Sequence, residues 1–428
     1  MLLVALVGGY WYERPLLRTG TGYAAHNACA LDHLAGRSDA QTDLPQNPLV
    51  PYLRSSAEGD VTTSSILGVL ASQRAWYAEG FGCTIATSAP ALGAATPVAP
   101  GANPFTTAPT PRPDAATVAA LASAFGDDLP ADQRSALGTR AVLIVKDGEL
   151  IGERYGDGFT AETRQLGWSM AKSVTNLLVG RLVLEGKVAL TNDHLRPEWT
   201  DDRAAITVDN LMRMTSGLTW DETYDLGTAI TQMLYGEADM PAYVASKPLA
   251  HPVGTYQQYS SGSTNLLCSV LRTATGSGAD LPRTQLFAPL GLSSAILEPD
   301  AAGNPVCSSY VWATPRDWAA IGQFALQGGQ WGGEQLLPTD WMANSTKAID
   351  VVSEEKGYAA GWWVNRQADG SLVEPSLPAD AYWASGHDGQ QIFVVPSADL
   401  VVVRLGFSPT LEKAQLRTVP LVASMVGS

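Results

Sequence analysis

The chain has 428 residues, of which 45% are hydrophobic and 16% are charged, a balance typical of a globular protein long enough for more than one domain. Lysine and arginine number 27 against 42 aspartate and glutamate residues, so the net charge is −15. Because no basic cluster offsets this charge, we expect no nucleic acid partner.

Residues 1–19 begin with an apolar stretch, Met1 to Tyr12, that is much shorter than the roughly 20 residues a membrane-spanning helix needs. We interpret residues 1–19 as a truncated signal segment or membrane anchor. This interpretation predicts an extracytoplasmic protein, periplasmic or secreted, and allows N-terminal membrane attachment. The alternative is a buried N-terminal segment.

Residues 20–114 are predicted to form an N-terminal extension and a linker. Residues 20–86 are mixed in composition, as in an extension that packs onto something larger. Residues 88–113 are rich in proline, alanine and threonine, which is typical of an extended linker or a surface wrap.

The four cysteines, Cys29, Cys83, Cys268 and Cys307, lack the C-x-x-C spacing of a zinc site, and we expect neither a metal nor another cofactor. In an oxidising compartment, the pairing Cys29–Cys83 and Cys268–Cys307 would keep each bridge within its own region. Closing the first loop would contribute about 4 kcal/mol in the chain-entropy account. Buried free thiols are the alternative.

The pattern of residues 115–428 predicts one α+β domain. An apolar run at 141–146, an Asp-Gly turn and a second strand at 149–155 predict a hairpin. Strands at 391–395 and 400–405 predict another. Helices are expected at 115–125, 209–214, 263–273, 317–326 and 410–425. Strands at both ends with a mainly helical middle predict one antiparallel sheet built from N- and C-terminal segments of this region.

Ser169 precedes Lys172 by three residues at the start of a predicted apolar helix that ends near Gly186. This spacing places hydroxyl and ammonium groups on one helix face, and the helix N-terminus favours developing negative charge. The same spacing recurs at Ser353 and Lys356, in a charged segment without a helical pattern. Helix context therefore marks Ser169 as the candidate nucleophile.

Tyr259, in the sequence Tyr-Ser-Ser-Gly before another apolar helix, is a candidate general base. A tyrosine with a pKa near 10 is a poor base, but nearby ammonium groups would favour its phenolate and lower the pKa. A packed aromatic ring is the alternative for Tyr259.

Gly386-His387-Asp388-Gly389 leads into the strand that starts near Ile392, and its glycines allow close approach of a ligand. We expect His387 to donate a hydrogen bond to the substrate or to the Tyr259 oxygen. The N–H of Gln390 or Gln391 is expected to complete an oxyanion hole with that of Ser169. A tight turn with a solvated histidine is the alternative.

The order Ser-x-x-Lys, Tyr-Ser-Ser and His-Asp-Gly resembles the motif pattern of the penicillin-recognising serine hydrolases, which include class C β-lactamases, D-alanyl-D-alanine peptidases, related esterases and 6-aminohexanoate-dimer hydrolase. Residues 211–218 and 313–318 also look like family segments. The resemblance implies a β-lactamase/transpeptidase-like fold over residues 115–428. It implies that Ser169 is acylated, that Lys172 lowers its proton affinity and that Tyr259 is the general base, with Lys172 as the other candidate for that role.

Two departures from many β-lactamases bear on the substrate: Ser261 stands in place of asparagine, and His387 in place of lysine. Because histidine is mostly neutral at pH 7, the permanent cation that would hold a lactam carboxylate is missing. The motifs look closest to the 6-aminohexanoate-dimer hydrolase branch, whose members cleave linear amides and often carboxylic esters. Tyr224 is expected beside the substrate; a packing aromatic on a surface loop is the alternative.

These features together predict a serine hydrolase that cleaves amide or carboxylic ester bonds of a small-molecule or short peptide-like substrate through an acyl-enzyme on Ser169. The alternatives are a D-Ala peptidase or β-lactamase, and a non-catalytic penicillin-binding-like sensor module.

Overall fold

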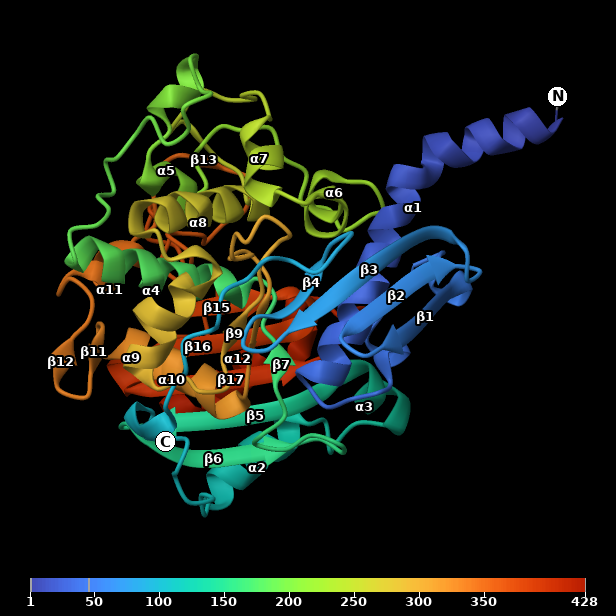
Figure 1. Ribbon diagram of the computed structural model, residues 1–428. Helices are drawn as coiled ribbons and strands as arrows, with labels where there is room; N and C mark the ends of the chain where they lie inside the picture. The colour runs from blue at the N-terminus through green and yellow to red at the C-terminus, as the bar shows by residue number, and fades with distance from the viewer. Residues whose placement is uncertain (1, 45–46, 428) are drawn as a thin grey trace.

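The computed structural model, which describes residues 2–44 and 47–427, is organised around a six-stranded antiparallel sheet (Figure 1). Its strand order is β14-β15-β16-β17-β5-β6, so the two predicted hairpins are joined where β17 pairs with β5. The strands are β5 (Thr139–Lys146), β6 (Glu149–Tyr155), β14 (Trp363–Val364), β15 (Tyr382–Gly386), β16 (Gln390–Val395) and β17 (Leu400–Gly406). The predicted α+β fold, with a sheet assembled from distant segments, is confirmed.

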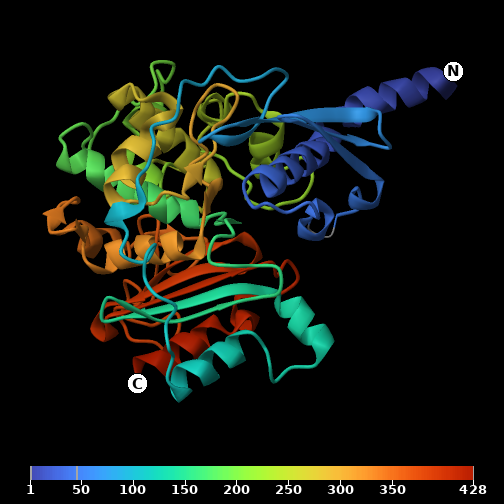
Figure 2. The same cartoon turned by 60° about the horizontal axis from the view of Figure 1, so that its bottom comes forward.

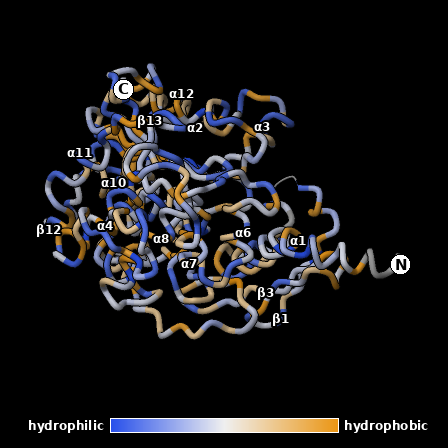
Figure 3. The backbone as a smooth tube through the Cα atoms, turned by 90° about the horizontal axis from the view of Figure 1, so that it is seen from above, coloured by the Kyte–Doolittle hydropathy of each residue, from blue (hydrophilic) through white to orange (hydrophobic). Residues whose placement is uncertain are grey.

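Helices cover both faces of this sheet, which explains why β16 and β17 are buried along their whole length (Figure 2). The helices α10 (Pro315–Leu326) and α4 (Met170–Leu184) pack on one face. The helices α2 (Ala115–Ala124) and α12 (Thr418–Val426) lie side by side on the other (Figure 3). Strands buried on both faces read as continuous apolar runs, and this is the pattern that made them predictable.

A mainly helical region lies beyond α4 and carries the shorter elements. Its helices are α5 (Val208–Met212), α6 (Ala229–Gly236), α7 (Met240–Ala245), α8 (Ser261–Thr275), α9 (Ala288–Leu290) and α11 (Trp341–Ser345). The helix α3 (Ala131–Leu137) lies outside this region and directly precedes β5. Its short strands are β7 (Gln165–Leu166), β8 (Tyr256–Gln257), β9 (Ile296–Leu297), β10 (Val311–Ala313), β11 (Gln330–Trp331), β12 (Glu334–Gln335) and β13 (Val352–Ser353).

The N-terminal extension consists of one long helix and a separate four-stranded sheet. The helix α1 (Leu2–His33) runs without interruption across residue 19, the expected boundary between the first two segments. The sheet has the order β1-β2-β3-β4, from β1 (Leu53–Glu58), β2 (Val61–Ile66), β3 (Leu70–Ala78) and β4 (Gly82–Ile85). We predicted no strands here, because β1 is mostly polar and β2 consists mostly of serine and threonine, so neither shows an apolar alternation.

The proline-rich segment 88–113 follows the surface of the main domain. Phe105 enters the main hydrophobic core, and Asn103 Nδ2 donates a hydrogen bond of 2.6 Å to Asp317 Oδ1. Thr96 N donates to Asp280 Oδ1 over 3.0 Å. Of the two predicted forms, the segment adopts the surface wrap.

The last predicted helix begins later than expected. Residues Lys413–Leu416 form a 3₁₀ turn, and Arg417 has a left-handed φ of 62°. Because a non-glycine residue in this conformation interrupts a helix, α12 starts only at Thr418.

Both predicted disulfides are formed, Cys29–Cys83 within the extension and Cys268–Cys307 within the main domain. In the described part of the chain, no helix combines the length and apolar character needed to cross a bilayer. Among the same residues, no group of three or more histidine, cysteine, aspartate or glutamate side chains could hold a metal ion.

Candidate active site

Ser169 lies at the N-terminus of α4, immediately after a sharp turn of the backbone. Trp168 has a left-handed φ of 49°, and Ser169 is the residue that caps the helix. The first amides of a helix have no intrahelical acceptor and carry partial positive charge. The Ser169 N–H therefore belongs to a set of donors suited to an oxyanion.

Lys172 is buried one turn further along α4, with 2% of its surface exposed. Its Nζ donates hydrogen bonds to Ser169 Oγ at 2.9 Å, to Ser261 Oγ at 2.9 Å and to the Ser308 carbonyl oxygen at 3.1 Å. The predicted pair of serine and lysine thus meets in space, and Ser261 from the second motif joins it.

Burial lowers the pKa of Lys172 to about 8, against the opposing effect of the Glu222 carboxylate. A buried ammonium loses hydration, which favours the neutral amine. Lys172 consequently has neutral amine available near neutral pH, where an ordinary lysine has almost none.

Glu222 is a residue of this site that we did not predict. Its Oε1 accepts a hydrogen bond from Ser261 Oγ at 2.5 Å, and its Oε2 accepts from Ser261 N at 2.8 Å and Trp220 Nε1 at 2.6 Å. The hydroxyl proton of Ser261 is therefore committed to Glu222. The only available signal was the position of Glu222 two residues before Tyr224 in the loop expected beside the substrate.

Tyr259 contacts the nucleophile but does not have the lowered pKa that we expected. Its phenol is hydrogen-bonded to Ser169, and Lys172 Nζ lies 4.9 Å from the centre of its ring. Burial raises the pKa of Tyr259 well above its usual range, and the nearby Tyr358 and Glu222 raise it further. The prediction of a phenolate favoured by ammonium groups is wrong, because desolvation dominates.

His387 faces the same site, although its ring lies against Tyr224 and Trp168, with centroid distances of 4.5 Å and 5.7 Å. Burial lowers the pKa of His387, but the Asp388 carboxylate, 2.7 Å from Nδ1, raises it above the ordinary value. The pKa of His387 is therefore higher than that of the ordinary histidine that we assumed. When His387 is protonated, its charge is paired with Asp388, so it offers little to a substrate carboxylate.

The third motif approaches Ser169 through Gly386, the last residue of β15. A Cβ atom built on Gly386 would lie 2.1 Å from the Gly167 carbonyl oxygen, so only glycine fits there. This contact brings the next residue, His387, beside the start of α4.

Gln390 and Gln391 lie on the returning strand β16, where Gln390 pairs with Gly386 and Gln391 with Ser385. The Gln390 side chain is used inside the fold, donating to the Gly406 carbonyl at 2.6 Å and accepting from Gly406 N at 3.0 Å. Both residues are buried.

Arg404 is hydrogen-bonded to the turn formed by His387, Asp388 and Gly389. It is 1% exposed and its Nη1 donates to the Gly389 carbonyl at 2.5 Å, while its Nη2 donates to the Leu137 carbonyl at 2.7 Å. Burial lowers the pKa of Arg404 to about 9. A buried arginine without a carboxylate among these partners is an unusual support, and we did not predict it.

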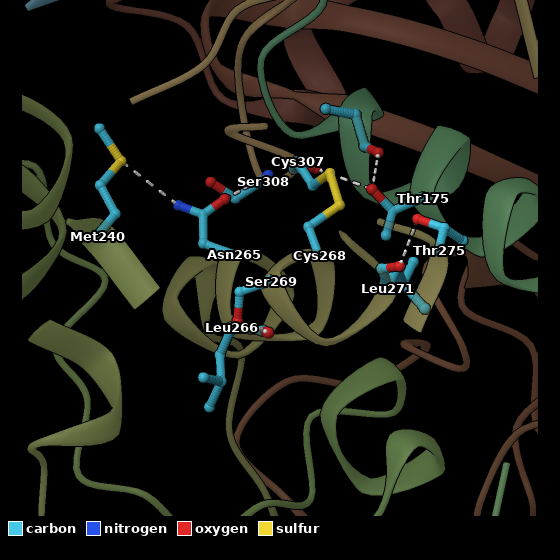
Figure 4. Close-up of a disulfide and its surroundings, with 11 residues drawn as sticks. Thr175, Met240, Asn265, Leu266, Cys268, Ser269, Leu271, Thr275, Cys307 and Ser308 are labelled. Carbon is cyan, nitrogen blue, oxygen red and sulfur yellow. Dashed lines mark hydrogen bonds between the residues drawn. A yellow bond between two sulfur atoms is a disulfide. The ribbon is translucent and has the colours of Figure 1, made fainter. Parts of the chain in front are cut away.

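The Cys268–Cys307 disulfide supports the opposite side of the site (Figure 4). It joins α8, which begins with Ser261, to the segment that supplies the Ser308 carbonyl. Asn265 Oδ1 accepts from Ser308 N at 2.9 Å and strengthens the same connection. Two of the three Lys172 contacts are thus fixed relative to one another.

Comparison with known proteins gives the family. The sequence profile of the beta-lactamase family matches residues 118–417. The 6-aminohexanoate-dimer hydrolase of Paenarthrobacter ureafaciens is 25% identical over 304 residues, which cover 63% of this chain and 73% of that protein.

Solved structures share the fold. A penicillin-binding protein homologue from Caulobacter crescentus superposes with a TM-score of 0.57 at 18% identity, covering 74% of this chain and 99% of that chain. A family VIII carboxylesterase superposes with a TM-score of 0.51 at 16% identity, covering 73% of this chain and 98% of that chain. With the serine and lysine geometry above, these matches lead to one conclusion: the chain belongs to the beta-lactamase family and is a serine hydrolase of the penicillin-recognising superfamily.

Proposed function

We propose that the protein hydrolyses linear amide or carboxylic ester bonds through an acyl-enzyme on Ser169, with Lys172 as the base that activates it. The observation that carries this proposal is the set of partners around Lys172 Nζ. A neutral amine has two protons and one lone pair. The Ser308 carbonyl can only accept a hydrogen bond, and the Ser261 hydroxyl already donates to Glu222.

Only Ser169 among these three partners has a proton free to give to the amine. In the acylation step, this proton passes from Ser169 Oγ to Lys172 Nζ while Oγ bonds to the carbonyl carbon. The tetrahedral intermediate then collapses, and the leaving amine or alcohol departs with a proton. In hydrolysis, a water molecule gives a proton to Lys172 Nζ while its oxygen bonds to the acyl carbon. The bond between this carbon and Ser169 Oγ then breaks, and Oγ takes the proton back from Lys172 as the acid is released.

Tyr259 is proposed to act as a neutral proton donor and acceptor rather than as a phenolate. Its hydrogen bond to Ser169 places it beside the reacting oxygen, and its raised pKa keeps the phenol protonated. A protonated phenol can pass a proton to the leaving group and receive one from Lys172. In this scheme Lys172 is the base, and Tyr259 transfers the proton from Lys172 to the leaving group.

The oxyanion hole is proposed to use the N–H of Ser169 and the N–H of His387. Ser169 begins α4, and the close contact between Gly386 and Gly167 brings His387 to the same place. The Gln390 and Gln391 amides, which we expected in this role, lie further along on the returning strand.

The proposed substrate is a linear amide or ester rather than a β-lactam. The His387 charge is paired with Asp388, so the site offers no unpaired cation there for a lactam carboxylate. The curated relative from Paenarthrobacter ureafaciens is a 6-aminohexanoate-dimer hydrolase, and the structural neighbours include a carboxylesterase. A D-Ala peptidase or β-lactamase remains the alternative that a substrate panel distinguishes.

We also propose that the protein works outside the cytoplasm. Its two disulfides support this proposal, because structural disulfides persist in oxidising compartments. Val7, Trp11 and Tyr12 are exposed on the first turns of α1, which extend beyond the rest of the molecule (Figure 3). Such apolar and aromatic residues would support attachment to a membrane surface. Cell fractionation of the full chain tests both statements.

A fluorophosphonate probe tests the nucleophile. The probe is expected to label Ser169 in the wild-type protein, and Ser169→Ala should abolish both labelling and ester hydrolysis. The matched control is Ser353→Ala, which removes the serine of the second Ser-x-x-Lys sequence and should change neither. An active Ser169→Ala variant would overturn the proposal.

A substrate panel tests the reaction class. We expect turnover of p-nitrophenyl acetate, slower turnover of linear aminohexanoate oligomers because their ends are charged, and little turnover of nitrocefin or D-Ala peptides. Preferred hydrolysis of nitrocefin or D-Ala peptides would instead favour the alternative enzymes. Stable acylation without turnover of any substrate would favour the sensor module.

A further inference from the structure

We propose that the N-terminal extension forms one wall of the substrate pocket, and that this pocket takes an uncharged, largely apolar group of the substrate. The inference rests on the proposed hydrolysis at Ser169. It assigns the substrate specificity of this hydrolysis to the pocket wall formed by the extension. The residues that form this wall all precede residue 118, where the match to the family begins.

The pocket is a cavity of about 500 Å³ between the extension and the main domain. Trp168, Tyr224 and His387 line it from the catalytic side. The extension supplies the facing wall, with Thr19, Gly20 and Tyr23 of α1 and Leu44, Asn47, Pro48, Val50 and Leu53 of the following segment. A volume of this size suits a small-molecule substrate.

The cavity lies next to the candidate catalytic residues, and aromatic rings line the side that faces them. Trp168 directly precedes the nucleophile, and its ring centre lies 6.2 Å from that of Tyr224. Tyr23 of the extension lies 6.1 Å from Trp168, measured between ring centres. A group of the substrate that extends from the scissile carbonyl past Trp168 therefore reaches the extension.

The extension is fixed in place, so it can act as a wall rather than as a loose flap. A Cβ atom on Gly22 would lie 2.5 Å from the Tyr235 carbonyl oxygen, which shows how closely α1 approaches α6. The same carbonyl accepts a hydrogen bond of 2.6 Å from Gln73 Nε2 of β3. The Tyr23 ring packs on that of Tyr235, with a centroid distance of 5.0 Å.

A buried pair adds a second attachment. His26 Nε2 of α1 lies 2.8 Å from Glu298 Oε2, and both side chains are almost completely buried. Glu298 also accepts from Cys83 N at 2.6 Å, in the last strand of the extension. The helix and the sheet of the extension thus meet on one carboxylate of the main domain.

The lining of the cavity indicates the chemistry of its occupant. Among the described residues that line it, there is no lysine or arginine, and the one carboxylate is that of Asp225. The His387 charge is balanced by Asp388. A substrate carboxylate would lose hydration there without gaining a cation, whereas apolar groups gain contacts with aromatic rings and with Leu44 and Val50.

Filling the cavity from the extension tests the proposal. Val50→Trp should lower kcat/KM for p-nitrophenyl octanoate by about ten-fold or more, while hydrolysis of p-nitrophenyl acetate changes less than about two-fold. The matched control is Val69→Trp, which adds the same side chain to an exposed position in the turn between β2 and β3. Val69→Trp should leave both rates unchanged.

A second variant enlarges the cavity and should have the opposite effect on the preference for acyl chain length. It keeps the proposal testable if Val50→Trp does not fold. Tyr23→Ala should shift the preference toward longer acyl chains, with unfolding curves recorded to confirm that the variant is folded. The wild-type protein should also hydrolyse a p-nitrophenyl monoester with a terminal carboxylate more slowly than the neutral ester of equal length.

The outcomes separate this inference from the proposed function. If the wild-type protein does not hydrolyse p-nitrophenyl acetate and Ser169 is not labelled, the proposed hydrolysis fails. If acetate is hydrolysed but Val50→Trp and Val69→Trp give the same dependence on chain length, the extension is not a wall of the pocket. Equal or faster cleavage of the carboxylate ester would overturn the assigned chemistry.

Discussion

Lys172 Nζ lies 2.9 Å from Ser169 Oγ in a position where the lysine is 2% exposed. Burial lowers the pKa of Lys172 to about 8. The pair therefore combines a serine hydroxyl with an amine that is partly neutral at physiological pH. If Lys172 is the base, as we propose, its protonation state controls the activity.

The first prediction concerns the pH dependence of hydrolysis. If neutral Lys172 is the base, kcat/KM for a neutral ester should rise with pH and level off above a midpoint near the pKa of about 8. Lys172→Arg should abolish this activity, because a guanidinium stays protonated at the pH at which the Lys172 amine becomes neutral. A rate that falls as pH rises through this range would show that protonated Lys172 is the active form.

The second prediction concerns stability. The pKa of Lys172 falls from an ordinary 10.5 to about 8 in the folded protein, so between these values the unfolded chain binds more protons. The free energy of unfolding should therefore rise with pH in this window, and the cost of burying the ammonium should be fully present below it.

Lys172→Met provides the reference for this measurement, because it lacks the titrating group. Between about pH 8 and pH 9.5, the wild-type protein should gain about 2 kcal/mol relative to Lys172→Met in denaturant unfolding. A constant difference between the two proteins would mean that the pKa of Lys172 is not lowered.

The third prediction concerns Glu222, whose charge raises the pKa of Lys172. Glu222→Gln removes this charge, so the rising limb of the pH profile should move to lower pH. The value of kcat should also fall, because the Ser261 hydroxyl loses its carboxylate acceptor and no longer reserves the Lys172 lone pair for Ser169.

Asp221→Asn is the matched control for Glu222→Gln. The Asp221 carboxylate accepts hydrogen bonds from Thr223, at 2.9 Å from its N and 2.7 Å from its Oγ1, within the same loop. Its removal should leave the pH profile where it is. Equal shifts in the two variants would assign the effect to the general charge of the loop.

The sequence predicted the parts of this site that depend on local pattern. The apolar spacing after Ser169 identified α4, and the apolar runs at both ends of the main domain identified the two hairpins of the central sheet. The absence of such a pattern around Ser353 correctly separated it from Ser169, since Ser353 lies in the short strand β13.

The parts that depend on tertiary contact could not be predicted. Ser261, 39 residues further along the chain, links Glu222 to Lys172 by hydrogen bonds, and no spacing rule predicts this connection. The pKa of Tyr259 depends on burial, which the sequence around it does not state. The extension could be recognised as packing onto a larger body, but not as lining the pocket, because Tyr23 contacts Trp168 across 145 positions.

The fourth prediction uses the two disulfides as a matched pair. Their cysteines are 54 and 39 positions apart, so removing either bridge should cost about 4 kcal/mol in the chain-entropy account. Only Cys268–Cys307 connects α8 to the segment that holds the Ser308 carbonyl. The double variant Cys268→Ala/Cys307→Ala should therefore also lower kcat for p-nitrophenyl acetate, measured well below its unfolding temperature.

Cys29→Ala/Cys83→Ala should lower stability by a similar amount while kcat for acetate is retained, since this bridge lies within the extension. Unfolding curves and acetate kinetics on both variants provide the comparison. A loss of kcat that tracks stability equally in the two would refute a special role for the bridge beside Lys172.

The fifth prediction concerns Gly386, where an added Cβ would lie 2.1 Å from the Gly167 carbonyl oxygen. Gly386→Ala should push the end of β15 away from the start of α4 and displace the proposed His387 donor from the oxyanion. Loss of one such donor typically lowers kcat by about a hundredfold or more. Gly152→Ala, in β6 of the same sheet, is the control, because its Cβ would meet the Thr117 methyl group at 2.7 Å and not the active site. Both variants should be less stable than the wild-type protein, but only Gly386→Ala should have a lower kcat. If Gly386→Ala keeps the wild-type kcat, the close contact between β15 and Gly167 is not required for catalysis.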